Sequence, residues 1–229
     1  MDAEQRAHQE DRAEEEALEQ DGAAGPPPAL DFPVIGIGAS AGGLRAYETF
    51  FDEMHEATGM AFVLVQHLDP HHQSELAELL QNHTRMPVLQ VEDGTHVEPN
   101  HVYVIPPGTS LSIEGGVLRL SDPVKRRGHR APIDLFFRSL AEDQGERAVA
   151  VVLSGTGSDG TLGLKAVKER AGITMAQDPD DAEYDGMPRS AIATGLVDVA
   201  LPAGELARKL VEYSRNADRI RLPKEPDAL

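Results

Sequence analysis

Residues 33–43 read PVIGIGASAGG, an apolar run that ends in a glycine-rich turn. Residues 34–38 have the length and composition of a buried strand, and residues 43–56 follow with large apolar side chains at helical spacing. A buried strand that turns through glycine into a helix is the repeating unit of an α/β sheet.

The rest of the chain repeats this alternation. Further strand-like stretches occupy residues 61–65, 87–91, 148–153, 172–176 and 197–201. Helical patterns occupy residues 75–80, 132–142, 161–170 and 203–215. Residues 101–105, 110–113 and 117–120, separated by glycine- and proline-containing turns, indicate an antiparallel hairpin insertion. We therefore expect a doubly wound α/β domain with a mostly parallel sheet and helices on both faces.

Composition excludes several classes of protein. The 229 residues include no cysteine, which excludes a disulfide scaffold, a zinc–thiolate site and a thiol nucleophile. A net charge of −18 argues against binding to nucleic acid, because phosphate binding needs a surface of Lys and Arg. The sequence has neither a long apolar run nor a secretory leader, so we expect a cytoplasmic protein without membrane insertion.

The negative charge divides the chain. Residues 1–30 hold nine acidic and two basic side chains, so they carry −7 of the −18. They lack large apolar groups and end in a proline run, which predicts a disordered tail and linker. Residues 31–214 form the expected catalytic domain, and the polar residues 215–229 form an exit or linker.

Three strand ends supply side chains for nucleophilic catalysis. Ser40 follows the first strand, His67 follows the second, and Asp159 follows the strand at 148–153. In a parallel sheet these carboxyl ends meet at one edge, where ligands bind. The spacing Gly38-x-Ser40-x-Gly42 also matches a nucleophile elbow, which exposes a serine at a sharp strand-to-helix turn. The combination favours a Ser-His-Asp hydrolase.

Other interpretations of these residues stay open. The glycine-rich turn at Ser40 is also typical of a phosphate cradle or a nucleotide-binding domain. His67, His71 and His72 have a spacing seen in metal sites, but Pro70 interrupts a helix there and no carboxylate partner is evident, so we expect no metal.

Acidic side chains elsewhere offer further alternatives. Asp69, Asp134 and Asp178 compete with Asp159 for the role of the triad acid. The segment 178–185 is dense in carboxylates and is read as an exposed acidic loop, with cation binding as the alternative.

Several motifs together resemble the catalytic domain of CheB-type protein-glutamate methylesterases. They are IGASAGG with Ser40, VQHLDP with His67, VEPNHVYVIPPGTSL, LSGTGSDGTLG with Asp159, and YDGMPRSAIATG. The resemblance runs from about residue 32 to about residue 210. The segment QHLDPHHQSELAELLQNHTRMPV is most similar to the methylesterase domain of proteins that join CheB-like and CheR-like (methyltransferase) domains in one chain.

The resemblance implies hydrolysis of glutamate γ-methyl esters on the cytoplasmic helices of chemoreceptors, with deamidation of glutamine as a second activity, and no cofactor. It implies that Ser40 is the nucleophile, His67 the general base and Asp159 the acid that orients the histidine. We expect an oxyanion hole from the backbone at Ala41, Thr156 and Gly157, and substrate contacts at Gly186 and Met187.

The sequence also departs from the family. Ala41, Thr156 and Ser158 stand where chemotaxis enzymes often have Thr, Met and Asn. Residues 1–30 are too few and too polar to form the receiver domain that usually precedes this domain in the family, so we expect no phospho-activation within this chain. We therefore expect control from a CheR-like domain or a regulator in trans.

A non-catalytic interaction module of a signalling complex is the alternative function. The basic cluster 125–130 is read as a solvated loop or as a dock for an acidic partner.

Overall fold

The computed structural model describes residues 30–54, 58–66, 75–123 and 131–220. Within these ranges, a seven-stranded sheet has the spatial order β10 (Val199–Leu201), β9 (Ile173–Gln177), β8 (Ala148–Val152), β1 (Val34–Ala39), β2 (Ala61–Gln66), β5 (Val102–Val104) and β3 (Val88–Gln90). A second sheet has the order β4 (Thr95–His96), β7 (Val117–Ser121) and β6 (Ser110–Glu114). The helices are α2 (Gly43–Asp52), α3 (Leu76–Leu80), α4 (Pro132–Gln144), α5 (Thr161–Glu169), α6 (Gly186–Ala193) and α7 (Ala203–Ile220), and a 3-10 turn (Gly145–Arg147) precedes β8.

The predicted fold class is confirmed. All pairs in the large sheet are parallel, and β6 and β7 form the expected antiparallel hairpin. The expectation that residues 101–105 belong to the antiparallel insertion was wrong, because β5 lies inside the parallel sheet between β2 and β3. Its three residues are all buried, as a central parallel strand requires. The sequence pattern also missed β4 and α6, and it ended α7 at residue 215, five residues early.

Strand β1 shows how the sequence sets the packing on both faces of the sheet. Ile35 and Ile37 point into the core cluster on the face of α2, α3 and α7. Gly36 and Gly38 alternate with them and leave the opposite face bare. A Cβ at Gly38 would lie 2.3 Å from Cγ2 of Ile133 in α4, so the glycines let α4 pack directly against the strand.

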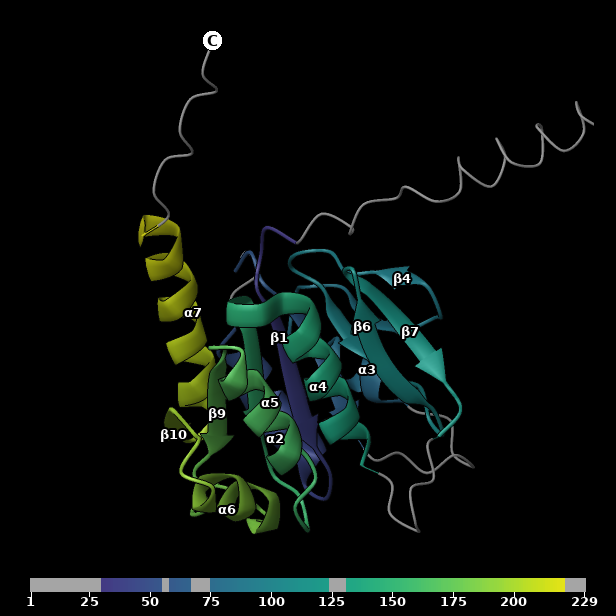
Figure 1. Ribbon diagram of the computed structural model, residues 1–229. Coiled ribbons are helices and arrows are strands. Elements are labelled where there is room, and N and C mark those ends of the chain that lie inside the picture. The colour runs from purple at the N-terminus through teal and green to yellow at the C-terminus, as the bar shows by residue number, and fades with distance from the viewer. Residues whose placement is uncertain (1–29, 55–57, 67–74, 124–130, 221–229) are drawn as a thin grey trace, which may run out of the picture.

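Helix α4 joins the two sheets (Figure 1). It packs against β1 on one side and against β6 on the other. The hydroxyl of Ser139 in α4 accepts a hydrogen bond of 3.1 Å from the backbone N–H of Ile113 in β6. Helix α5 lies beside α4 on the same face, and α2 and α7 pack together on the other face.

The chain reverses direction across the large sheet between β1 and β8. From β1 it passes through α2 to β2 on one side, and from β8 it passes through α5 to β9 on the other. Such a switch point opens a crevice at the carboxyl ends of the strands, where ligands of α/β proteins bind. The loops after β1 and β8 therefore lie at the position where a site is expected.

Candidate active site

Ser40 occupies a tight turn between β1 and α2. The N–H of Gly43 donates a hydrogen bond of 2.9 Å to the carbonyl of Ser40, and Gly42 has the left-handed φ of 70°. A Cβ at Gly42 would lie 2.7 Å from the hydroxyl of Ser154, so the turn needs glycine for both its conformation and its space. Ser40 itself is partly exposed, as an elbow nucleophile must be.

The end of β8 lies directly against this turn. The N–H of Ser40 donates to the carbonyl of Ser154 over 2.9 Å, which extends the pairing of β1 and β8 by one step. A Cβ at Gly155 would lie 3.0 Å from the Cβ of Ser40 and 2.2 Å from the sulfur of Met187. The absence of a side chain at Gly155 thus permits the loop after β8 to approach the nucleophile.

Asp159 lies in the same loop and faces the beginning of α4. Its carboxylate accepts hydrogen bonds from the N–H groups of Ile133 at 3.1 Å, Asp134 at 3.0 Å and Gly160 at 2.9 Å. A carboxylate at a helix N-terminus is stabilised by the free N–H groups and by the helix dipole. Ile133 packs on Gly38, two residues before Ser40, so α4 links Asp159 to the strand that ends in the nucleophile.

His67 falls outside the described residues, together with Asp69, His71 and His72. Gln66, the residue before His67, ends β2 and pairs in register with Ala39, the residue before Ser40. The amide of Gln66 donates a long hydrogen bond of 3.4 Å to the carbonyl of Ser40. The contact between His67 and Ser40 stays a prediction.

The two described alternatives to Asp159 as triad acid, Asp134 and Asp178, have other hydrogen-bond partners. The carboxylate of Asp134 is buried and accepts the N–H of Gly163 at 2.8 Å. Burial raises the pKa of Asp134; the bond from Gly163 opposes this rise, and the nearby Asp159 adds to it. The carboxylate of Asp178 accepts the N–H of Asp180 at 2.9 Å inside its own loop. Neither arrangement is that of a residue held toward Ser40.

The predicted oxyanion donors have unused N–H groups. Among the described residues, none accepts a hydrogen bond from the backbone N–H of Ala41, Thr156 or Gly157. Gly157 has a left-handed φ of 82°, and its carbonyl accepts the hydroxyl of Ser190 at 3.1 Å. They belong to the loops after β1 and β8, which approach each other at Ser40 and Gly155. Their catalytic role stays a prediction.

Met187 does not line the site as expected. Its side chain is fully buried, and its N–H donates to the carbonyl of Gly155 at 2.8 Å. Met187 therefore packs under the loop after β8 at Gly155, and its side chain has no exposed surface for a substrate in this conformation. Gly186 is partly exposed at the start of α6, where a Cβ would lie 3.0 Å from the N–H nitrogen of Gly157. Its contact with substrate stays a prediction.

An open pocket of about 520 Å³ includes Ser40, Ala41 and Gln66. Its other lining residues are Gly42, Gly43, Leu44, Arg45, Glu48 and Glu183. Sequence reasoning missed the charged members. Arg45 and Glu48 lie three residues apart on the helix that follows the nucleophile, so the helical period was the available signal. Glu183 comes from a distant loop, and no local pattern pointed to it.

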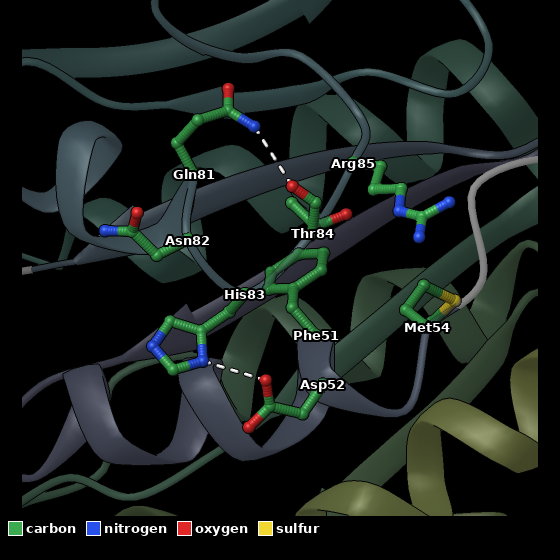
Figure 2. Close-up of a pocket in the computed structure, with 8 residues that line it drawn as sticks. All are labelled: Phe51, Asp52, Met54, Gln81, Asn82, His83, Thr84 and Arg85. Atoms are coloured by element: carbon green, nitrogen blue, oxygen red, sulfur yellow. Dashed lines mark hydrogen bonds and ion pairs between the residues drawn. The ribbon is translucent and has the colours of Figure 1, made fainter.

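A larger pocket of about 610 Å³ lies at the other end of α2 (Figure 2). The imidazole of His83 is 2.8 Å from the carboxylate of Asp52 there, and 3.6 Å from that of Glu48. None of the residues that line it is a predicted site residue, so we place the candidate chemistry in the smaller pocket at Ser40.

Within the described ranges, no group of three His, Asp or Glu side chains is arranged to hold an ion. In the acidic loop, Asp181 accepts hydrogen bonds from Gln177 at 2.8 Å and Ala203 at 3.0 Å, and Asp185 pairs with Arg189. Its carboxylates therefore stabilise the loop.

Among the helices described, none is both long and apolar enough to cross a bilayer.

Comparison with known proteins identifies similar chains. The family model described as CheB methylesterase matches residues 35–210. The catalytic domain of the CheB methylesterase of Thermotoga maritima is 31% identical, with a TM-score of 0.74 over 80% of this chain and 100% of that domain.

Two curated proteins are also similar. A protein-glutamate methylesterase/protein-glutamine glutaminase of Geobacillus kaustophilus is 36% identical over 184 residues, 78% of this chain and 53% of the relative. An uncharacterized 104.1 kDa protein of Rhodobacter capsulatus is 52% identical over 145 residues, 63% of this chain but only 15% of that protein. The matched region is thus about half of one relative and a small part of the other.

Proposed function

The chain belongs to the CheB methylesterase family, and from this membership we propose that it is a serine hydrolase that removes methyl groups from glutamate γ-methyl esters of chemoreceptor-type proteins. The observation that carries the proposal is the position of Ser40. It stands partly exposed in a glycine turn at the switch point of the sheet, directly against the β8 loop that also holds Asp159. The backbone N–H of Ala41, the next residue, has no acceptor among the described residues.

The proposed mechanism is acyl transfer. His67 takes the proton of Ser40 as the serine oxygen attacks the ester carbonyl. The negative charge on the carbonyl oxygen is stabilised by the N–H of Ala41 and by the N–H groups of Thr156 and Gly157. Methanol leaves with the proton from His67, and a water molecule deprotonated by His67 then hydrolyses the acyl-serine and releases glutamate. Asp159 orients the imidazole and stabilises its charged form.

Glutamine deamidation uses the same groups. Attack of Ser40 on a γ-carboxamide gives the same acyl-serine, and ammonia leaves in place of methanol. The relative from Geobacillus is named for both activities, which supports the second activity for this chain. No metal or other cofactor takes part in either proposed reaction.

We propose further that the substrate is brought to the site by a partner or a tether. Residues 31–229 carry −11, and a receptor helix rich in glutamate would be repelled by that charge. A CheR-like methyltransferase domain in the same polypeptide, or a regulator in trans, would hold enzyme and substrate together. We place this reaction in the cytoplasm, where the methylated helices of chemoreceptors are expected.

The test is release of methanol from methylated cytoplasmic fragments of chemoreceptors. We expect release by the wild-type chain and by Ser121→Ala, which changes an exposed serine of β7, and no release by Ser40→Ala or His67→Ala. A fluorophosphonate probe should label the wild type and Ser121→Ala but not Ser40→Ala. A wild type that neither releases methanol nor takes the label would overturn the proposal and favour an interaction module.

A further inference from the structure

Ser154 lies behind the nucleophile turn and has no exposed surface. Its hydroxyl donates a hydrogen bond of 2.9 Å to the carbonyl of Ala41. The same oxygen accepts a hydrogen bond of 3.0 Å from the N–H of Tyr184. One buried hydroxyl therefore connects the turn that carries Ser40 with the loop that precedes α6.

The orientation of Ser154 is fixed by its backbone. Its carbonyl accepts the N–H of Ser40 at 2.9 Å, and its own N–H donates to the side-chain oxygen of Gln177 at 2.8 Å. The amide nitrogen of Gln177 donates in turn to Asp181 at 2.8 Å. All polar atoms of Ser154 thus have partners. The carbonyl of Tyr184, a second acceptor for the hydroxyl, is farther away at 3.4 Å, so the shorter bond to Ala41 is favoured.

The bond to Ala41 bears directly on the proposed oxyanion hole. The carbonyl of Ala41 belongs to the peptide that enters the left-handed turn at Gly42. Because a peptide unit is planar, this bond fixes the plane of the Ala41–Gly42 peptide. The N–H of Ala41 lies in the preceding peptide, whose carbonyl, that of Ser40, accepts the N–H of Gly43 at 2.9 Å. With the peptide planes on both sides of Ala41 held, the direction of the Ala41 N–H is restricted. That N–H has no acceptor among the described residues to hold it in place.

The second bond holds the other wall of the site. Besides the bond from the N–H of Tyr184 to Ser154, the carbonyl of Tyr184 accepts the N–H of Gly155 at 2.9 Å. Position 42 touches the same segment, since a Cβ there would lie 3.1 Å from the ring of Tyr184 and 2.9 Å from the Cβ of Glu183. Among the described residues, the nucleophile turn, the end of β8 and the loop before α6 therefore meet at the hydroxyl of Ser154.

We propose that Ser154 is a positioning residue for the proposed esterase reaction: its hydroxyl holds Ala41 and Tyr184 so that the N–H of Ala41 points to the oxyanion. The role rests on the proposed function, but the clamp itself is a physical property of the chain. Ser154 does not touch the reacting atoms, so its removal should change the turnover of bound substrate and leave binding unchanged.

Three variants test the hydroxyl. Ser154→Ala removes it, Ser154→Thr retains it, and Ser154→Val has the shape of threonine without it. In methanol release we expect Ser154→Ala to lower kcat by about 10- to 100-fold with KM within about twofold, because small displacements of catalytic groups have effects of this size. The kcat of Ser154→Thr should be well above the kcat of Ser154→Val. Equal kcat for the Thr and Val variants would overturn the proposal.

Ser214→Ala is the matched control. Ser214 is also buried, and its hydroxyl donates to the carbonyl of Thr58 at 2.8 Å, so the variant loses the same kind of bond in α7. We expect it to retain kcat even if its thermal midpoint falls. A loss of kcat equal to that of Ser154→Ala would show a general effect of stability and contradict a positioning role.

Hydrogen–deuterium exchange separates the clamp from the function. In Ser154→Ala, peptides that cover residues 40–43 and 184–186 should exchange faster than in the wild type, whereas Ser214→Ala should leave them unchanged. Unchanged exchange in Ser154→Ala would overturn the clamp whatever the activity. If the wild type releases no methanol, the proposed function fails, and the exchange result still decides the clamp.

Discussion

Asp159 and Asp134 each cap the helix of the other. The carboxylate of Asp159, just before α5, accepts the N–H of Asp134 at 3.0 Å in the first turn of α4. The carboxylate of Asp134 accepts the N–H of Gly163 at 2.8 Å in the first turn of α5. This exchange fixes the two helix starts against each other, and it places the proposed triad acid at a site that α4 and α5 define together.

The first prediction concerns the charge of Asp134. Burial raises its pKa above the ordinary value, so folding favours its protonated form. Stability is therefore lost as pH rises through the unfolded and then the folded pKa. Asp134→Asn removes the charge and keeps an oxygen for Gly163. The free energy of unfolding in urea, measured for the variant and for wild type, should therefore change in favour of the variant: the variant becomes more stable relative to wild type as pH rises from 3 to 7. A difference that is constant with pH would contradict this.

Asp134→Ala is the matched variant for the cap. It removes the acceptor as well as the charge, and the N–H of Gly163 is then left without its partner in a buried position. We expect it to be less stable than Asp134→Asn by about 1–3 kcal/mol at pH 7, the usual cost of an unsatisfied buried donor. Equal stability of the two variants would show that the bond to Gly163 contributes nothing.

The second prediction separates the two roles of Asp159. Asp159→Ala should lower the free energy of unfolding by about 1–2 kcal/mol, because α4 loses its cap, and should lower kcat by roughly 10⁴-fold while leaving more activity than Ser40→Ala. Asp159→Asn keeps one acceptor for the helix but cannot stabilise an imidazolium. It should therefore be more stable than the Ala variant and similarly slow. A fast Asp159→Asn enzyme would remove Asp159 from the triad.

The fold could be predicted where one local pattern decides the structure. Residues 148–153 and 61–65 are continuous apolar runs, and such runs become central strands whatever lies around them. Residues 101–105 are equally apolar, but their neighbours in the sequence are hairpin strands, and proximity in the sequence suggested the wrong sheet. Helix α6 begins with a Gly-Met-Pro sequence and buries only three residues, so its apolar pattern was too weak to detect.

The site could be predicted only in part, for a related reason. Ser40 follows β1 directly and Asp159 lies in the loop after β8, so the rule that chemistry lies at strand ends selects both as candidates. Met187 lies in a motif that resembles the family, but its side chain is buried and so is not exposed to a substrate. Burial depends on packing against segments that are distant in the sequence, and the motif does not reveal it. Ser154 bonds to Ser40 and Ala41, and Glu183 lines the same pocket as Ser40, each across more than 100 residues of sequence, and no local spacing encodes such a contact.

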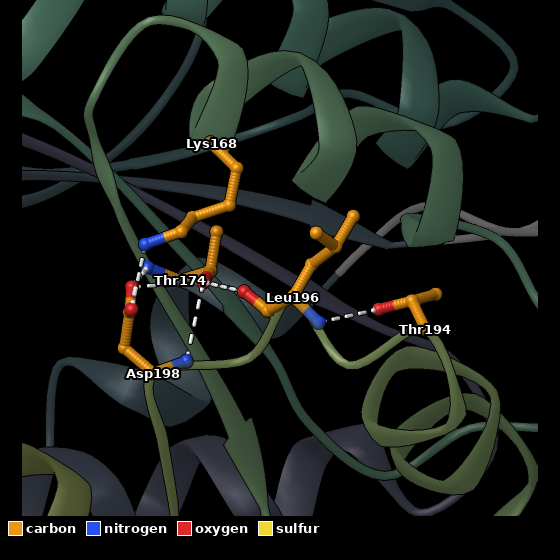
Figure 3. A network of polar contacts seen from close by, with 5 residues as sticks. All are labelled: Lys168, Thr174, Thr194, Leu196 and Asp198. Carbon is orange, nitrogen blue, oxygen red and sulfur yellow. Dashed lines mark hydrogen bonds and ion pairs between the residues drawn. The ribbon is translucent and has the colours of Figure 1, made fainter.

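The third prediction concerns an ion pair at the start of β9 (Figure 3). Asp198 is 2.6 Å from the amine of Lys168 and accepts the N–H and hydroxyl of Thr174 at 2.9 and 3.0 Å. Partial burial acts to raise the pKa of Asp198, but the bonds from Lys168 and Thr174 together outweigh burial and lower it. The stabilisation is thus present above the unfolded pKa and is lost as pH falls through the folded one.

Asp198→Asn tests this sign. At pH 7 we expect a loss of about 0.5–1 kcal/mol in the free energy of unfolding, because the pair is one-third exposed and screened by solvent. The loss should shrink as pH is lowered from 6 to 3. Glu169→Gln is the control, since its exposed i,i+4 pair with Lys165 should contribute no more than about 0.5 kcal/mol. A loss at Asp198 that grows at low pH would contradict the prediction.

The fourth prediction concerns the charges in the pocket at Ser40. Arg45 forms no ion pair with any described residue, whereas Glu48 and Glu183 add negative charge to the same pocket. For an acid-rich receptor fragment, Arg45→Gln should raise KM and Glu183→Gln should lower it, each about two- to tenfold at low salt and less at high salt. Arg170→Gln, which changes an exposed residue after α5 that does not line the pocket, should leave KM unchanged at low and at high salt. Shifts in kcat alone would argue against this role.

The fifth prediction uses the close approach of the β8 loop to the nucleophile. Gly155→Ala would place a Cβ 2.2 Å from the sulfur of Met187 and 3.0 Å from the Cβ of Ser40, so the buried Met187 side chain and the contact between the loop and the turn must both shift. We expect labelling of Ser40 by a fluorophosphonate to slow by at least about 100-fold. Gly195→Ala, after α6 and outside the proposed site, is the control, because nothing lies within 4 Å of its Cβ and only its left-handed φ is strained. It should slow labelling far less. If both variants label at the same reduced rate, backbone strain rather than the contact between β8 and Ser40 limits the nucleophile.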